Sequence, residues 1–290
     1  QAMDRLGVDT TFFNPFYDVG LVTDPDVHDE AADIFGEKLE MYLDCEMHSI
    51  ETKGEGFNLS WHDAEGKTHS KQFDEVLAAA GRRPNIQRLG LENTALSLDE
   101  NGIPEVDPRT MQCGESSIFI AGDAAGHRNL LHEASDEGRI AGANAAHHPE
   151  VEAIVRRTSI TIGFTEPQMA SVGPSFAELE NEDILIGEVS YNNQGRARVM
   201  DIDEGLVRFY ADKTTCKFLG AEMIGPRMEN MAHLLAWAAQ KEMRVQEMLS
   251  MPFYHPVLEE GLRTGLRDLA EKLKVKGQCP PEDFGISPGS

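Results

Sequence analysis

Residues 117–123 read Ser-Ile-Phe-Ile-Ala-Gly-Asp, an apolar run that ends in a glycine and a carboxylate. The run predicts a buried strand, and in open α/β sheets ligands bind outside the carboxyl ends of the strands. Gly122 would let a ligand approach the backbone, and Asp123 can accept hydrogen bonds from a sugar or polyol hydroxyl. Asp123 could equally cap the helix that follows. The stretch therefore indicates an α/β fold with either a ligand site or a helix cap at this edge.

A helix is predicted over residues 131–146, directly after this stretch. Its first turn offers free backbone N–H groups and a positive dipole end, which suit an anionic ring or a phosphate. Leu131 and His132 are therefore candidate cofactor-binding residues, although an isolated histidine here is more often a surface residue or a cap. Alanines and glycines fill the second half of the helix, so another backbone can approach it closely.

The residues before this stretch predict an α/β unit over residues 1–85. Asp24 is a good N-cap and Pro25 suits the first position of a helix. Glycine-containing connections between short alternating strands indicate an antiparallel meander. The expected elements are a strand at 9–13, a helix from 24 to about 39, a strand at 40–43, meander strands at 48–53, 57–63 and 67–73, and a buried parallel strand at 75–81.

Two further units are expected along the chain, at residues 86–150 and at residues 151–275. In the last one strands mostly precede helices, which is the α+β pattern. Its expected strands are 159–163, 184–191, 205–210 and 216–224, and its expected helices are 175–180, 229–242, 245–249 and 256–274. Residues 276–290 contain three prolines and are expected to form an extended tail. The predicted fold class is thus α/β followed by α+β.

Composition excludes several classes of protein. The 290 residues carry a net charge of -24, which argues against nucleic acid or an anionic membrane surface as a partner. No run of 18 apolar residues is present, so a transmembrane helix is not expected. The four cysteines show no metal-ligand spacing, which predicts unpaired thiols and no metal site. A soluble, cytoplasmic protein fits these observations.

Residues 253–260 read Phe-Tyr-His-Pro-Val-Leu-Glu-Glu and suggest an acid/base pair. Pro256 suits a first helical position, so His255 is expected at the entrance of a helix. A carboxylate bonded to one imidazole nitrogen fixes the tautomer and leaves the other nitrogen for proton transfer. Spacing alone leaves Glu259 and Glu260 both open as that carboxylate, and a lone histidine beside a proline is more often structural.

Residues 79–85 read Ala-Ala-Gly-Arg-Arg-Pro-Asn. Small residues at a strand end, followed by basic ones, suit a crossover between domains near a cofactor, with Gly81 at the turn. The same segment also fits an exposed linker with two solvated arginines.

Five motifs in this order resemble the pyridine-nucleotide-disulfide oxidoreductases. Residues 80–85 resemble the end of that family's pyridine-nucleotide domain. Residues 118–124 resemble its second FAD-binding motif, whose aspartate contacts the ribityl chain of the flavin. Residues 131–134 resemble the helix start beneath the flavin ring, and residues 164–173 the opening of the dimerisation domain.

The fifth motif is His255-Pro256 with Glu260, which resembles the family's His-Pro-Thr-x-x-Glu catalytic signature, with Val257 in place of the threonine. The resemblance implies that His255 is the base toward a substrate dithiol and that Glu260 orients it. It also implies a homodimer through residues 151–275, in which the dyad of one subunit completes the disulfide site of the other.

The resemblance further implies a partial NAD(P)-binding domain at residues 1–85, the C-terminal part of an FAD-binding domain at 86–150 and a dimerisation domain at 151–275. FAD and NAD or NADP would be cofactors of the full-length enzyme, with a dithiol or disulfide as substrate. Asn14 stands where NAD-preferring members place an acid, so the choice between NAD and NADP stays open. Gly81, Gly122, Asp123, Leu131, His132 and Asn14 are the candidate cofactor-binding residues.

Within the family, the pattern is most similar to the dihydrolipoamide dehydrogenases. A glutathione-reductase-like or soluble-transhydrogenase-like flavoenzyme and a non-catalytic dimerisation module remain alternatives. The family's Gly-x-Gly-x-x-Gly loops and Cys-x-x-x-x-Cys pair do not occur in the sequence. We therefore expect a fragment that begins just after a nucleotide-binding loop, holds no FAD tightly and has no dehydrogenase activity by itself.

Overall fold

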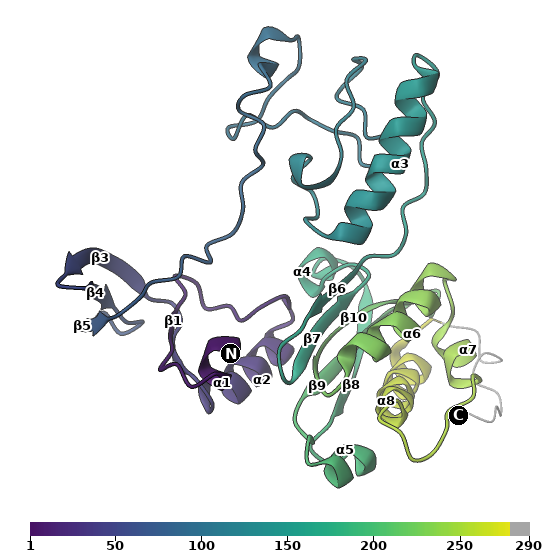
Figure 1. Cartoon of the computed structure of the whole chain (residues 1–290). Coiled ribbons are helices and arrows are strands. Elements are labelled where there is room, and N and C mark those ends of the chain that lie inside the picture. Colours follow the sequence, from purple (N-terminus) through teal and green to yellow (C-terminus); the bar gives the residue numbers. More distant parts are fainter. Residues whose placement is uncertain (279–290) are drawn as a thin grey trace. The chain divides into compact units, whose positions relative to one another are not determined.

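The computed structural model describes residues 1–278 and divides them into two units (Figure 1). One unit joins Gln1–Val76 to the residues from Thr158 onward, and the other is Leu77–Arg157. The mixture of α/β and α+β structure predicted from the sequence is confirmed. The predicted boundaries of the domains stay a prediction.

The first segment contains a small parallel sheet and one long helix. Its elements are α1 (Ala2–Arg5), β1 (Thr11–Phe13), α2 (Pro25–Gly36) and β2 (Glu40–Tyr42), and β1 pairs in parallel with β2. Asp24 caps α2 as predicted, because its carboxylate accepts the backbone N–H groups of Asp26 and Val27. The helix ends at Gly36, three residues before the predicted end.

The predicted antiparallel meander is confirmed as β3 (Glu46–Lys53), β4 (Gly56–His62) and β5 (Thr68–Phe73). Trp61 is its buried centre and packs against Phe13 and Tyr42 of the parallel sheet. The predicted strand at 75–81 is wrong. The parallel sheet has only two strands among the described residues, so the run finds no neighbour to pair with, and Leu77 is 80% exposed.

The second unit consists largely of loops around one helix. It contains η1 (Leu91–Asn93), η2 (Gly122–Ala124) and α3 (Leu131–His147), and α3 confirms the predicted helix. The predicted strand at 117–121 is wrong: only an isolated bridge joins Phe119 to Gln112, because no continuous strand runs alongside. The small core of this second unit is formed by Val106, Met111, Cys113 and Ile140.

A five-stranded antiparallel sheet dominates the other unit, in the order β6-β7-β10-β9-β8. The strands are β6 (Ile160–Gly163), β7 (Gln168–Val172), β8 (Ile184–Ser190), β9 (Leu206–Asp212) and β10 (Phe218–Gly225), and the helices are α4 (Phe176–Leu179), α5 (Gly195–Met200), α6 (Met228–Gln240), α7 (Val245–Leu249) and α8 (Glu260–Lys276). The short β7 and α5 were not expected from the sequence. Residues 256–259 form a turn before α8 instead of its first turn.

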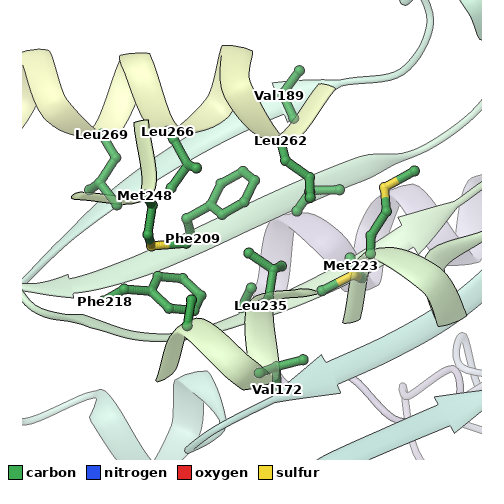
Figure 2. Packing of buried hydrophobic residues seen from close by; sticks show 14 of the residues in the cluster. Val172, Val189, Phe209, Phe218, Met223, Leu235, Met248, Leu262, Leu266 and Leu269 are labelled. Atoms are coloured by element: carbon green, nitrogen blue, oxygen red, sulfur yellow. The ribbon is translucent and has the colours of Figure 1, made fainter. Parts of the chain in front are cut away.

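The two faces of this sheet are covered by different parts of the chain. On one face α6 and α8 enclose a core that includes Phe209, Met223 and Leu266 (Figures 1 and 2). On the other face α2 packs its apolar side against Met169 and Ile224. Successive residues of a strand point to opposite faces of the sheet. Met223 therefore packs in the core under α6 and α8, and Ile224 packs in the core under α2.

A buried carboxylate fastens α2 to the second face. Glu222 of β10 is fully buried and accepts the backbone N–H groups of Thr23, Asp24 at 2.7 Å and Phe176 at 2.9 Å, and the Thr23 hydroxyl at 2.9 Å. The Tyr210 hydroxyl donates to Asp24 at 2.9 Å. Burial, reinforced by the nearby carboxylates, raises the pKa of Tyr210, so it stays a donor.

The cysteines differ from one another. Cys45 and Cys113 are unpaired and buried, as predicted, whereas Cys216 is disulfide-bonded, which contradicts the prediction of unpaired thiols. Cys279 lies outside the described residues. Within the described part of the chain no helix is long and apolar enough to span a membrane, and no group of three or more His, Cys, Asp or Glu side chains is arranged to hold a metal ion.

Candidate functional site

His255 and Glu260 form a hydrogen-bonded pair before and at the start of α8. The imidazole Nδ1 lies 2.9 Å from one carboxylate oxygen of Glu260 and 3.0 Å from the other. The described residues show no bond between His255 and Glu259, so the geometry selects Glu260 from the two candidates. The His255 side chain is 80% exposed, and its Nε2 has no partner in the described structure.

The Glu260 carboxylate also fixes the turn that carries the histidine. It accepts the backbone N–H of Val257 at 3.2 Å. Because the side chain ties back to residue 257, the chain turns at 256–259 and α8 begins only at Glu260. The hydrogen bond from His255, together with that from Val257, holds the pKa of Glu260 below its ordinary value despite partial burial.

Two residues that sequence reasoning missed hold this turn against the sheet. The buried Tyr191 hydroxyl donates to the Leu258 carbonyl at 3.1 Å, and the Gln194 amide donates to the Val257 carbonyl at 2.8 Å. Both residues follow β8, more than sixty positions earlier in the chain. No local sequence signal links them to residues 253–260, because their role depends on tertiary contact.

Glycines allow α8 to lie directly on the sheet. A Cβ at Gly261 would stand 2.4 Å from the Tyr191 hydroxyl oxygen, and one at Gly265 would stand 2.2 Å from the Phe209 ring. Such distances leave no room for any side chain. The backbone of α8, and therefore Glu260 at its first turn, has a fixed distance from β8 and β9.

An imidazole of this kind can move a proton. The carboxylate on Nδ1 fixes the tautomer and stabilises the protonated ring, and the exposed Nε2 can accept a proton from an incoming acid. Since Nε2 is exposed and has no partner among residues 1–278, a substrate thiol or hydroxyl can reach it. The pair is thus a candidate general base.

Gly122 and Asp123 lie in the second unit, at η2. Gly122 is buried with a φ of +69°, and a Cβ there would lie 3.2 Å from that of Ala134, so only glycine suits the position. The Asp123 carboxylate is exposed and makes no hydrogen bond to the described residues. It does not act as a helix cap, so it is available to a ligand.

The start of α3 lies just beyond. Leu131, 88% exposed, and His132 present their side chains to solvent, and Leu130 at the N-cap offers no side-chain cap. The first backbone N–H groups of α3 are therefore free to bind an anionic or polar ligand group. The free carboxylate of Asp123 can in addition accept hydrogen bonds from the hydroxyls of a ligand.

The remaining candidates occupy loops. Gly81 lies in an exposed connection with a φ of +87°, and a Cβ built there would meet no other described residue within 4 Å. Asn14 follows β1 directly, and its amide donates to the Asp18 carbonyl at 2.9 Å and also to the Asp18 carboxylate. The structure brings His255 and Glu260 together, but it connects neither Gly81 nor Asn14 to another predicted site residue.

Comparison with known families gives two matches that together span most of the chain. Residues 1–138 match the pyridine nucleotide-disulphide oxidoreductase family, and residues 159–265 match the pyridine nucleotide-disulphide oxidoreductase dimerisation domain.

Similar curated proteins are dihydrolipoyl dehydrogenases. That of Geobacillus stearothermophilus is 30% identical over 226 residues, covering 77% of this chain and 47% of the relative. That of Chlamydia trachomatis is 27% identical over 258 residues, covering 88% of this chain and 54% of the relative. The chain therefore spans about half the length of the curated relatives it matches.

Solved structures share the fold. LpdA from Mycobacterium tuberculosis has a TM-score of 0.76 at 23% identity, covering 92% of this chain and 57% of that one. The HOCl-induced flavoprotein disulfide reductase RclA from Escherichia coli has a TM-score of 0.73 at 21% identity, covering 89% and 58%.

Proposed function

Because this chain belongs to the pyridine nucleotide-disulphide oxidoreductase family, we propose that it is part of a dihydrolipoyl dehydrogenase. The whole enzyme would oxidise a dihydrolipoyl dithiol to the disulfide and reduce NAD⁺ to NADH, releasing one proton. The observation that carries the proposal is the His255–Glu260 pair with its free Nε2. The curated relatives that bear this name support the choice of substrate.

In this reaction His255 takes a proton from a substrate thiol at Nε2. The resulting thiolate is the nucleophile of thiol–disulfide exchange, whereas the thiol is inert. Glu260 keeps Nδ1 protonated and compensates the positive charge that forms on the ring. Tyr191 and Gln194 hold the turn so that the imidazole keeps one position.

The second unit would hold the flavin. Asp123 would accept a hydrogen bond from the ribityl hydroxyls, and the first turn of α3, with Leu131 and His132, would lie beneath the ring. When bound, FAD supplies two-electron transfer between a dithiol–disulfide pair and a nicotinamide. Gly81 would lie at the crossover from the nicotinamide-binding domain, and Asn14 would contact the coenzyme ribose of NAD or NADP.

The dimerisation domain would pair two copies of the chain. Apolar side chains stand exposed on α6 and just before the histidine: Leu234, Trp237 and Tyr254 are 47%, 68% and 78% exposed. An isologous contact would bury exposed apolar side chains of this kind. The dyad of one subunit would then serve a disulfide held by the other, and the enzyme would act in the cytoplasm.

The test uses the full-length protein that contains this chain, with dihydrolipoamide and NAD⁺. We expect His255→Gln to lower kcat by at least about a hundredfold, because general base catalysis contributes that much or more. Flavin content, read from the visible absorbance, should not change. Activity within a few-fold of the parent would refute the role of His255, and turnover of glutathione disulfide instead of dihydrolipoamide would refute the substrate.

A further inference from the structure

Gly122 is tied to α3 through a side chain that no sequence motif pointed to. Its backbone N–H donates to the Glu137 carboxylate at 2.7 Å, across fifteen residues of chain. Glu137 is only 1% exposed. A buried N–H needs an acceptor, and for Gly122 that acceptor is this carboxylate.

Arg156 holds the carboxylate in place. Its guanidinium lies 3.1 Å from Glu137 and 2.5 Å from Glu133, and it also donates to the Pro108 carbonyl at 3.0 Å. Glu133 and Glu137 are one helical turn apart, so their like charges would repel each other. The shared arginine removes that repulsion and orients both carboxylates.

We propose that Glu137 and Arg156 are positioning residues for flavin binding, an inference that rests on the proposed function. Glu137 draws the Gly122 N–H inward, and the chain then turns so that the next side chain, Asp123, points to solvent with its carboxylate free. The polyol acceptor is thereby set before the ligand arrives. Preorganisation of this kind lowers the cost of binding.

The ionic cluster of Glu133, Glu137 and Arg156 does more than join helix α3 to the loop that carries Gly122. Apolar packing could make that join without the desolvation cost of three buried or half-buried charges. An ionised acceptor behind Gly122 instead fixes the direction of one N–H group, and therefore the backbone of the adjacent Asp123. Loss of the acceptor should loosen this turn while the core around Met111 and Ile140 remains packed.

The experiment measures FAD affinity in the full-length protein by flavin fluorescence on reconstitution of the apoprotein. The variants are Glu137→Leu, Glu137→Gln and Arg156→Met. Asp136→Leu is the matched control, because Asp136 lies beside Glu137 on α3 but pairs with Arg157 at 3.3 Å. Visible circular dichroism of the bound flavin reports the geometry of the site independently of activity.

We expect Glu137→Leu and Arg156→Met to weaken FAD binding by about tenfold or more and to alter the flavin dichroism. Glu137→Gln should restore part of the affinity, since its amide oxygen can still accept the Gly122 N–H. Asp136→Leu should bind as the parent does.

FAD affinity within about twofold of the control in Glu137→Leu and Arg156→Met would overturn the inference, and so would a loss that Glu137→Gln does not partly restore. If Glu137→Leu fails to fold, Arg156→Met decides between these outcomes. A parent protein that binds no flavin would instead refute the proposed function, and with it this inference.

Discussion

Replacing Glu222 by glutamine tests whether one buried carboxylate fastens α2 to the antiparallel sheet. The carboxylate accepts four hydrogen bonds, two on each oxygen: Thr23 and Asp24 N–H on one, the Thr23 hydroxyl and Phe176 N–H on the other. A glutamine must present an NH₂ group at one of the two places. In either orientation at least one buried N–H then faces a donor.

The magnitude follows from these contacts. An unsatisfied buried donor costs about 1–3 kcal/mol, and each remaining bond loses about 1 kcal/mol when its acceptor changes from charged to neutral. The total is roughly 3–5 kcal/mol against the opening of α2. This predicts that amide hydrogen exchange in residues 25–36 becomes at least about a hundredfold faster.

Hydrogen exchange read by mass spectrometry is suitable, because it reports α2 separately from the other unit of the chain. The control is Glu188→Gln on β8, which lies two strands from β10 in the same sheet. It makes the same charge change at a side chain that is 53% exposed and 3.9 Å from Arg208. Surface changes of this kind cost within about 0.5 kcal/mol. If the amide hydrogens of α2 exchange at the same rate in both variants, Glu222 does not fasten α2 to the sheet.

Three further predictions concern the dyad and the thiols. Gly261→Ala should cost about 1–3 kcal/mol in the free energy of unfolding, because the added methyl meets the Tyr191 hydroxyl at 2.4 Å; urea denaturation measures it, and an unchanged midpoint would contradict the contact. Because the pKa of Glu260 is lowered in the folded chain, its carboxylate stabilises the turn at pH values above its ordinary pKa of 4.5. That stability is lost as the pH falls through the lowered pKa. Carboxyl ¹³C titration should therefore show the Glu260 pKa rising in His255→Ala, and no rise would exclude the hydrogen bond. Burial raises the pKa of Cys113, so its alkylation by iodoacetamide at pH 7 should be slower in the folded chain than in urea; equal rates would show that the thiol is accessible.

Sequence patterns predicted those elements whose signals are local. The N-cap at Asp24, the glycine-separated meander and the long helix α3 depend on neighbours in the chain, and all three are confirmed. The apolar runs at 75–81 and 117–121 are not strands, because a strand needs a partner and periodicity does not reveal whether one is present.

The residues of the candidate site likewise fall into those that a local sequence pattern identifies and those that only tertiary contact reveals. His255 and Glu260 are five residues apart, so the motif identified both. Tyr191 and Glu137 act on residues far along the chain through a hydroxyl and a carboxylate that have no recognisable spacing. Their contributions emerge only when the chain is folded, and the roles of all the site residues stay predictions until they are tested.

The missing side chains along α8 set how this helix can change over evolution. A methyl group would collide at Gly261 and Gly265 of α8, and also at Gly187 of β8, which faces the helix. The main chain of α8 therefore lies directly on the sheet, so the outward positions of the helix are free to vary in charge and size. Inserting a single residue into α8, however, would rotate the following part of the helix by about 100°. Side chains would then face the sheet at the places where only glycine fits. Laboratory libraries that diversify the outer face and leave the helix length unchanged should therefore keep most of their members folded.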